Sequence, residues 1–537
     1  MTAQRRLPVA VLAVALLFGA CGSRTPSASP RTTSSTGPGA AGETAAPGTF
    51  GLGIEYGVPG LAAAYRPTGI TRIKPALEFG VWGNLEPTRG RRDFRPLDTL
   101  VHEYQAAGFV DVQLIVSAES PWASRKASTD PMPRDEYLAD YGSFVAALVE
   151  RYDGDGRDDA PGLVNPVHEY GLERELSKFW GSSAADYVRL LEIAAPAIRA
   201  ADPSARILVA AVLAVDVFDG SPAATTIEQR WRTNEPFRKS RMDVVSILGA
   251  CRLYDDVDMH SLGDATEIAP TIAWIRARLS EAGCPDRPVW VGDAFPASTL
   301  VAYNNRPFYP AAGGQQGAIT ALLGAAVDAG DPAHAVGLAW ARAQVARGLV
   351  RKAVLAAAAG AAGINLGNLE DWTTGLVPAD RLFAAGAGTS VVSGHVDTTI
   401  SNNRPGGPLP YAGDGFSRAR SAGAARPSFT ALTQVAGALR GATAVAREPA
   451  ADPGAWLFLL GGRAPATWIG WVDDGTQDLP GAGPATREVR LPVAGAGVTI
   501  TRIAADGTAA AAPTSLGAVG GIALVTLDRT PVIITAR

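Results

Sequence analysis

Acidic residues stand at the ends of two predicted strands, where parallel sheets gather the side chains that do chemistry. The segment PVWVGDAFPAST at 288–299 runs through an apolar burst to Asp293 and then into a loop. The segment VNPVHEYGLERELSKFW at 164–180 places Glu169, Glu173 and Glu175 at or just beyond the end of another strand. Two carboxyl groups facing each other across a cleft can hydrolyse a glycosidic bond, one as proton donor and one as nucleophile or base.

The strands and helices expected to hold these acids lie between residues 50 and about 375. Short apolar runs alternate with helical patterns such as AADYVRLLEIAAPAIRAA at 184–201, which is typical of βα units around a parallel sheet. Eight units predict a closed (β/α)8 TIM barrel with its active site at the carboxyl ends of the strands. An open doubly wound sheet is the alternative, but IEYGVPG after the first strand does not fit a phosphate loop. The predicted strands are 52–56, 70–76, 110–116, 167–173, 207–212, 257–260, 289–293 and 362–366.

The pattern changes after about residue 430. Short strand-like segments separated by turn residues replace the helical periodicity, and such a series predicts a small antiparallel β-sandwich. We therefore expect a barrel over 50–430 and a C-terminal β-sandwich over 431–537. The predicted strands are 455–461, 466–472, 488–491, 498–503, 521–527 and 532–534.

Several segments of the chain resemble clan A glycoside hydrolases, and family 39 in particular. GVWGNLEPTRGRRDFRPLDTLV resembles the early part of that group, and VSAESPWAS resembles its third-strand Pro-Trp turn. FWGSSAADYVRLLEIAAPAIRAADPSARI and DDVDMHSLGD resemble the segments after the fourth strand and at the sixth. The β-rich tail ending LVTLDRTPVIITAR resembles the accessory sandwich of these enzymes. The matches follow the family's order along the chain.

The resemblance assigns catalytic roles to two acids. Glu173 stands where the family has its acid/base, and Asp293 stands where its nucleophilic glutamate closes the seventh strand. Leu172 replaces the family's asparagine, which is expected to bind the sugar 2-hydroxyl. Asp293 is one methylene shorter than glutamate, so its carboxylate is drawn back by about 1.5 Å, a misplacement that such reactions tolerate poorly. The alternatives are a working hydrolase, retaining or inverting, a catalytically degenerate carbohydrate-binding protein, and a barrel with an unrelated activity.

Five further residues are candidates for contact with a sugar. Each of three tryptophans could offer a flat face to a sugar or simply fill the barrel mouth. His260 resembles the family's sixth-strand histidine, which could bind substrate, position Asp293 or serve structure alone. Lys74 stands near a basic residue that orients the family's nucleophile, and an ion pair in the barrel wall would explain it equally well. The three tryptophans are Trp82, Trp122 and Trp372.

The N-terminus indicates export. Two arginines precede a short apolar run and FGAC, which is typical of a signal peptide over 1–20. FGAC resembles a lipoprotein lipobox with Cys21 as the acylated residue, although Phe18 departs from the usual leucine; ordinary cleavage nearby is the alternative. Residues 21–49 are rich in Ser, Thr, Pro and Gly, which predicts a disordered tether. We expect a bacterial lipoprotein outside the cytoplasm, held to the membrane only through its lipid.

The composition of the chain limits the classes of partner and ligand that we expect. The 537 residues carry 48 basic and 52 acidic side chains, a net charge of -4, and no basic cluster suggests nucleic-acid binding. Cys251 and Cys284 are either a disulfide or two buried thiols. No cofactor is expected, but RYDGDGRDDAPG at 151–162 offers closely spaced carboxylates that either bind calcium or form a solvated loop. The four acids of this loop are Asp153, Asp155, Asp158 and Asp159.

Overall fold

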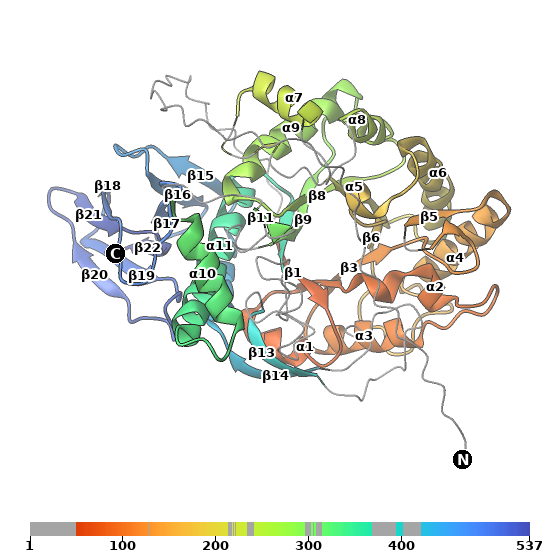
Figure 1. The fold of residues 1–537 in the computed structure, drawn as a ribbon, viewed down its shortest axis with the longest axis horizontal. Helices are drawn as coiled ribbons and strands as arrows, with labels where there is room; N and C mark the ends of the chain where they lie inside the picture. Colours follow the sequence, from red (N-terminus) through yellow and green to blue (C-terminus); the bar gives the residue numbers. More distant parts are fainter. Residues whose placement is uncertain are drawn as a thin grey trace, which may run out of the picture. The chain divides into compact units, whose positions relative to one another are not determined.

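A closed barrel of eight parallel strands forms the larger part of the computed structural model (Figure 1). The strands follow the order β1-β12-β9-β8-β7-β6-β3-β2 around the barrel, and every neighbouring pair is parallel. The structure describes residues 50–127, 129–212, 217, 218, 220, 222–233, 241–295, 302, 303, 306, 307, 314–367, 394–400, 420–507 and 509–537.

All eight predicted barrel strands are confirmed. The apolar runs identify them because a parallel strand is covered on both faces, as in Val289–Ala294, where every residue is buried. The strands are β1 (Gly51–Gly57), β2 (Arg72–Pro75), β3 (Asp111–Val116), β6 (Glu169–Leu172), β7 (Arg206–Val212), β8 (Asp256–Ser261), β9 (Val289–Ala294) and β12 (Gly363–Leu366). Shorter strands lie in the connections: β4 (Ser124–Lys126), β5 (Asp130–Pro133), β10 (Ala302–Tyr303), β11 (Arg306–Pro307), β13 (Val396–Ile400) and β14 (Arg420–Ala425).

Amphipathic helices surround the barrel. In α6, Ser183 and Asp186 form a capping box that fixes the first turn. The helices are α1 (Ala62–Tyr65), α2 (Trp82–Leu85), α3 (Arg95–Ala106), α4 (Leu138–Glu150), α5 (Leu176–Phe179), α6 (Ala184–Ala201), α7 (Ala224–Thr233), α8 (Arg241–Gly249), α9 (Ile268–Glu281), α10 (Gln316–Val327), α11 (His334–Ala358) and α13 (Pro427–Leu439). Short 3-10 helices are η1 (Arg66–Thr68), η2 (Leu77–Gly80), η3 (Asp135–Tyr137) and η4 (Ala265–Glu267).

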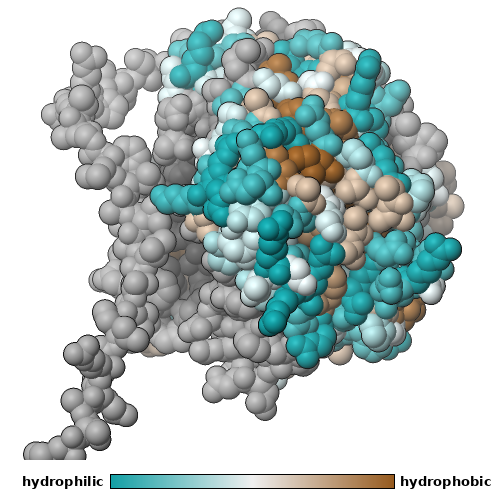
Figure 2. Space-filling model, turned by 90° about the vertical axis from the view of Figure 1, so that its right-hand side faces the viewer, coloured by the Kyte–Doolittle hydropathy of each residue, from teal (hydrophilic) through white to brown (hydrophobic). Residues whose placement is uncertain are grey.

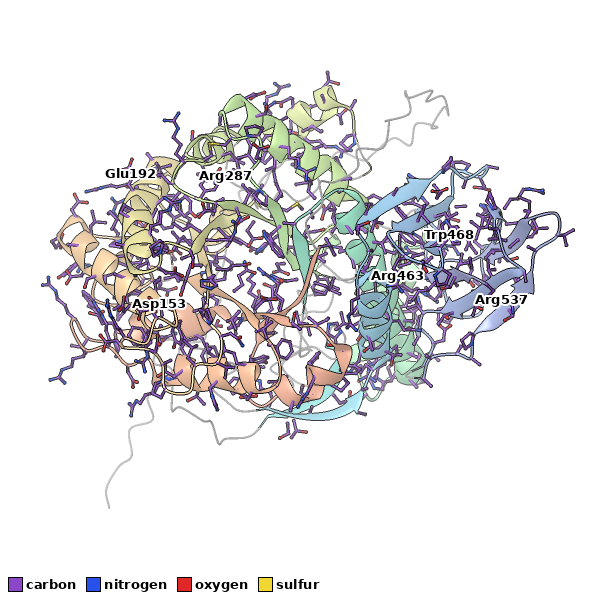
Figure 3. All side chains as sticks on the ribbon, turned by 180° about the vertical axis from the view of Figure 1, so that it is seen from behind. Asp153, Glu192, Arg287, Arg463, Trp468 and Arg537 are labelled. Carbon is purple, nitrogen blue, oxygen red and sulfur yellow. A yellow bond between two sulfur atoms is a disulfide. The ribbon has the colours of Figure 1, made fainter. Side chains whose placement is uncertain are left out.

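The C-terminal part is the expected β-sandwich. A six-stranded antiparallel sheet, β15-β16-β17-β22-β19-β20, and the pair β18-β21 enclose an apolar core that includes Trp468, labelled in Figure 3. The boundary expected after residue 430 falls inside α13, so helical structure runs to Leu439. The strands are β15 (Ala444–Glu448), β16 (Ala455–Gly461), β17 (Thr467–Val472), β18 (Arg487–Pro492), β19 (Gly497–Arg502), β20 (Thr514–Gly517), β21 (Ile522–Leu527) and β22 (Val532–Ala536).

Hydrogen bonds from α11 and α13 connect the barrel to the sandwich. Arg347 Nε donates to Thr530 Oγ1 at 2.9 Å, and Gln434 Nε2 donates to the Arg502 carbonyl at 3.0 Å. Figure 2 views the side of the molecule at the right of Figure 1, where hydrophilic residues cover most of the described surface between small hydrophobic patches. Within the described ranges, none of the helices has the length and apolar character needed to cross a bilayer.

Cys251 and Cys284 form a disulfide, so the first of the two sequence alternatives holds. Their Cα atoms lie 6.3 Å apart and they are 33 residues apart in the chain. Closing a loop of this length lowers the entropy of the unfolded chain and stabilises the fold by about 3–4 kcal/mol in the chain-entropy description. The bridge joins the segment after α8 to the segment after α9.

Candidate functional site

The carboxyl ends of the barrel strands surround a cavity of about 160 Å³. Four of the residues selected from the sequence line it together: Lys74, Glu173, His260 and Asp293. They come from β2, the residue after β6, β8 and β9. In a TIM barrel this edge is where active sites lie. The other residues that line the cavity are Glu55, Tyr56, Pro75, Leu77, Glu78, Ile115, Arg174, Glu175, Phe179, Asp258, Leu262 and Phe295.

The backbone turns sharply at Glu173. Its φ is 65°, in the left-handed region that a non-glycine residue enters at a cost of about 1–2 kcal/mol. The turn brings the carboxylate to the end of β3, where the Ala118 backbone N–H donates at 2.5 Å and Ser117 Oγ donates at 3.1 Å. Tyr56, which also lines the cavity, has a φ of 57°. Backbone strain of this kind is concentrated at functional sites.

Glu173 is poised to exchange a proton near neutrality. Burial raises the pKa of its carboxyl group to about 7, against the opposing effects of the Ala118 N–H, the Arg174 charge and the Ser117 hydroxyl. Only 3% of the residue is exposed. A carboxylic acid that is partly protonated at neutral pH can serve as general acid and then as general base.

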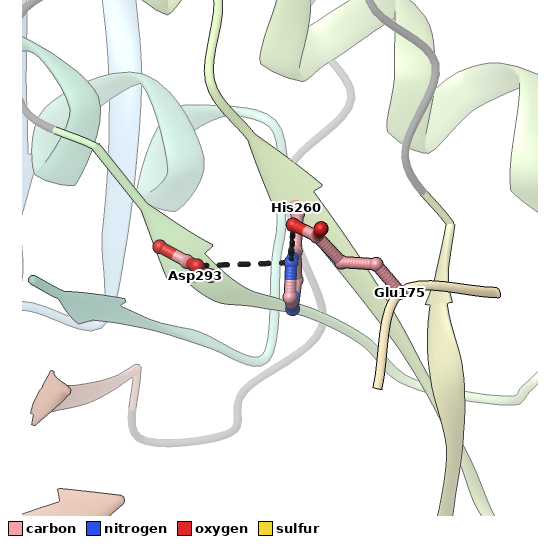
Figure 4. A group of neighbouring side chains, drawn as sticks. All are labelled: Glu175, His260 and Asp293. Atoms are coloured by element: carbon pink, nitrogen blue, oxygen red, sulfur yellow. Dashed lines mark hydrogen bonds and ion pairs between the residues drawn. The ribbon is translucent and has the colours of Figure 1, made fainter. Parts of the chain in front are cut away.

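An imidazole joins two carboxylates beside the cavity (Figure 4). His260 Nδ1 donates to Glu175 Oε1 at 2.9 Å and lies 3.8 Å from Asp293 Oδ2. The other ring nitrogen, Nε2, lies 3.7 Å from Asp258 Oδ2. Burial alone would lower the pKa of His260, but hydrogen bonds with Asp258 and Glu175 and the nearby negative charges raise it to about 10. The ring is therefore a cation at neutral pH.

Gly292 makes room for one of these carboxylates. A Cβ at this position would lie 1.9 Å from Asp258 Oδ1, a distance that no side chain could adopt. The absence of a side chain lets Asp258 of β8 approach the backbone of β9, beside His260. The glycine that precedes Asp293 is therefore needed for the close packing of the charged side chains.

A buried hydrogen bond connects Lys74 to Glu55 at the cavity that Asp293 also lines. Lys74 Nζ donates to Glu55 Oε1 at 2.6 Å and to the Gly292 carbonyl at 2.9 Å. Burial and then the Asp293 charge raise the pKa of Glu55, against the lowering effect of Lys74. Lys74 therefore connects β1 and β2 to the strand that carries Asp293.

Three residues of this network also have side chains that can bind a metal. Glu175, His260 and Asp293 each offer a ligand atom, and these atoms lie within 4.8 Å of one another. In this structure the carboxylate neighbours hold the His260 ring protonated, and the three residues form an ion-pair network.

Two predicted sugar platforms do not line the cavity. Trp82 is 0% exposed, and the centroid of its ring lies 5.7 Å from that of Phe144 and 5.5 Å from that of Tyr141. Its ring has no face for a ligand, which corrects that prediction. Trp122 is half-buried, lies 4.8 Å from Trp82 and donates its Nε1 hydrogen to a backbone carbonyl. Trp372 lies outside the described residues.

Replacing Trp82 with alanine should lower the free energy of unfolding by about 3–5 kcal/mol, the usual cost of removing a buried tryptophan. Chemical denaturation of the wild type and the variant measures this difference. At a temperature where the variant is folded, sugar affinity should be unchanged. A loss of sugar affinity with unchanged stability would restore the platform role.

The acidic loop at 151–162 does not bring its four aspartates together. Asp159 accepts hydrogen bonds from the Gly154 and Gly156 amides at 3.2 and 2.9 Å, which fold the loop around its side chain. Among the described residues, the carboxylates that converge there are those of Glu150, Asp153 and Asp155. Figure 3 shows Asp153 in the half of the picture opposite the sandwich. Two of the four predicted calcium ligands, Asp153 and Asp155, therefore converge with Glu150, whereas Asp158 and Asp159 are not part of this group.

Several lining residues escaped the sequence reasoning. Glu55 stands near the end of the first strand, so the rule that selected Asp293 would have selected it. Asp258 is two residues before His260 and therefore shares its face of the strand. Glu175 was seen near the fourth strand, but nothing in the sequence showed that it would contact His260. The positions of Glu55 and Asp258 in their strands could have identified them, whereas the contact between Glu175 and His260 could not be predicted from the sequence.

Comparison with known proteins supports the fold. No protein-family model and no curated protein sequence matches the chain. Among solved structures, a family 39 glycoside hydrolase from Bacteroides cellulosilyticus WH2 matches with a TM-score of 0.55 at 13% identity, over 90% of this chain and 80% of that chain. A glucosidase from Croceicoccus marinus matches with a TM-score of 0.51 at 12% identity, over 92% and 96%. A β-xylosidase from Caulobacter crescentus CB15 matches with a TM-score of 0.51 at 14% identity, over 91% and 97%.

These similarities confirm the resemblance of the chain to glycoside hydrolases in its fold. A (β/α)8 barrel followed by a β-sandwich is the architecture predicted from the sequence. At identities of 12–14% the similarity concerns the fold, and the chemistry has to be argued from the site.

Proposed function

We propose that this protein is a glycoside hydrolase in which Glu173 is the acid/base and Asp293 is the nucleophile or base. One observation carries the proposal. The carboxyl groups of these two residues, from the fourth and seventh barrel strands, line one cavity at the carboxyl end of the barrel. The fold shared with solved glycosidases agrees with it.

The site supplies each step of the reaction. Glu173, with a pKa of about 7, protonates the glycosidic oxygen as the bond to the anomeric carbon breaks. Asp293 either attacks the anomeric carbon or removes a proton from a water that attacks it. In the first case Glu173 then deprotonates the water that releases the sugar. The His260 cation beside Asp293 stabilises the carboxylate.

Hydrolysis of a panel of substrates tests the proposal. Purified protein is incubated with aryl glycosides and with polysaccharides, and released aglycone and reducing sugar are measured, with Asp293→Ala as the matched control. We expect release by the wild type and none above background by the variant. Binding of sugars without release would instead indicate a carbohydrate-binding protein that has lost catalysis.

We also propose that the protein is exported and anchored through Cys21. This proposal rests on the sequence, because residues 1–49 lie outside the described ranges. Cys21→Ala should move the protein from the membrane fraction to the soluble fraction, because the sulfur that carries the lipid is gone. Fractionation followed by immunoblotting measures the shift. An unchanged membrane fraction would contradict the anchor.

A further inference from the structure

Glu55 is a further acid at the reaction centre, and the proposed chemistry gives it no role. It lies in β1, is 1% exposed and lines the same cavity as Asp293. Its Oε1 atom accepts the hydrogen bond from Lys74 Nζ at 2.6 Å. None of the described residues donates a hydrogen bond to its Oε2 atom, which is buried.

The second oxygen of Glu55 faces Asp293. A Cβ placed on Gly367 would lie 3.7 Å from Glu55 Oε2 and 3.9 Å from Asp293 Oδ1, so both oxygens border the same small space. The charge of Asp293 and a hydrogen bond between the two side chains are among the causes that raise the pKa of Glu55. When two carboxyl groups share a buried site, the pKa of one is raised, and that group can keep its proton and donate a hydrogen bond to the other.

The surrounding charges decide which of the two acids holds the proton. Asp293 lies 3.8 Å from the His260 cation through its other oxygen, Oδ2. Glu55 faces the Lys74 cation, but a protonated carboxyl still accepts that hydrogen bond through its carbonyl oxygen. Burial and the charge of Asp293 raise the pKa of Glu55, against the effects of Lys74 and His260. These observations place the proton on Glu55.

We propose that Glu55 is a positioning residue that stays protonated at neutral pH and donates a hydrogen bond to Asp293. The bond occupies one oxygen of Asp293 and leaves the other directed toward His260 and the cavity. Lys74 fixes both partners, because it binds Glu55 and the carbonyl of the residue before Asp293. The arrangement holds the short aspartate in one orientation. Its catalytic consequence rests on the proposed function, whereas the protonation state does not.

Infrared spectroscopy tests the protonation state of Glu55 directly and needs no substrate. The protein is measured in a Glu173→Gln background, which removes an acid whose pKa is raised to about 7, and is compared with the Glu55→Gln, Glu173→Gln double variant, so that only the contribution of Glu55 differs. We expect the single variant at pH 7 to show the C=O stretch of a buried protonated carboxyl, and the double variant to lack it. Absence of the band in the first protein, or its persistence in the second, would overturn the proposal.

Kinetics with a glycoside substrate then test the positioning role. Glutamine mimics protonated glutamate, because its carbonyl can accept from Lys74 and its amide can donate to Asp293. Glu55→Gln should therefore keep kcat within about tenfold of the wild type, roughly the effect of weakening one hydrogen bond. Glu55→Leu should lose about 10²-fold in kcat with little change in KM, because Asp293 is no longer oriented.

The outcomes separate the two proposals. Loss of kcat in Glu55→Gln equal to that in Glu55→Leu would contradict the positioning role and favour a simple counter-ion for Lys74. If Glu55→Leu does not fold, the glutamine variant and the infrared band still decide. If the wild type hydrolyses no glycoside, the proposed function fails, while the infrared experiment continues to test the protonation of Glu55.

Discussion

Asp293→Ala should reduce kcat for glycoside hydrolysis by on the order of 10³-fold, because the reaction loses its nucleophile or base. The change removes the side chain of a residue that is 8% exposed and leaves His260 with its hydrogen bond to Glu175 and its ion pair with Asp258. The fold should therefore persist. Steady-state kinetics measure the loss, and circular dichroism with thermal melting checks the structure.

The matched control for this change is Asp293→Glu. It keeps a carboxyl group at the end of β9 and extends it by one methylene into the cavity, so activity should be retained or increased. Activity of the alanine variant equal to that of the wild type would exclude Asp293 from the chemistry. If Asp293→Glu is as inactive as Asp293→Ala in a folded protein, the carboxyl group alone is insufficient and its position decides.

Glu173→Gln should reduce kcat by about 10²–10⁴-fold for substrates with poor leaving groups, which depend on proton donation. Substrates with an acidic phenol as leaving group should be affected less, because that oxygen leaves without a proton. The comparison of two aryl glycosides with different phenols measures the difference. An equal loss for both phenols would argue against proton donation by this residue.

The dependence of activity on pH is an independent test of Glu173 as the proton donor. Glu173 donates a proton only in its protonated form, and its pKa is about 7. Wild-type kcat/KM should therefore fall as the pH rises through about 7, and Glu173→Gln should lack this alkaline limb. A limb that persists unchanged in the variant would belong to another group.

The barrel could be predicted because its strands are buried on both faces. Continuous apolar runs such as the one before Asp293 are sufficient to identify strands of that kind. Two sandwich strands escaped prediction, and both are more exposed: β15 has partly exposed residues throughout, and β20 is largely exposed. Their sequences therefore lack the apolar alternation that marked their neighbours.

The site was predicted in part. Topology places the acids of different strands at one edge of the barrel, and this is why Glu173, Asp293, His260 and Lys74 line one cavity. The left-handed backbone at Glu173 depends on contacts with β3, more than 50 residues earlier in the chain. A local sequence pattern cannot predict such a contact.

Burial of a tryptophan was equally hard to foresee. Trp82 is covered by aromatic side chains of α4, among them Tyr141 and Phe144. A tryptophan that follows a barrel strand looks the same in the sequence whether it faces a ligand or a helix. The distinction arises only when the helix is in place.

Proton NMR of the wild-type protein acting on a glycoside tests hydrolysis by Glu173 and Asp293, because it detects both bond cleavage and the anomer first released. The account predicts a free reducing sugar of one initial anomeric configuration from the wild type, and none from folded Asp293→Ala. Release of that sugar at the wild-type rate by both Asp293→Ala and Glu173→Gln would contradict the account.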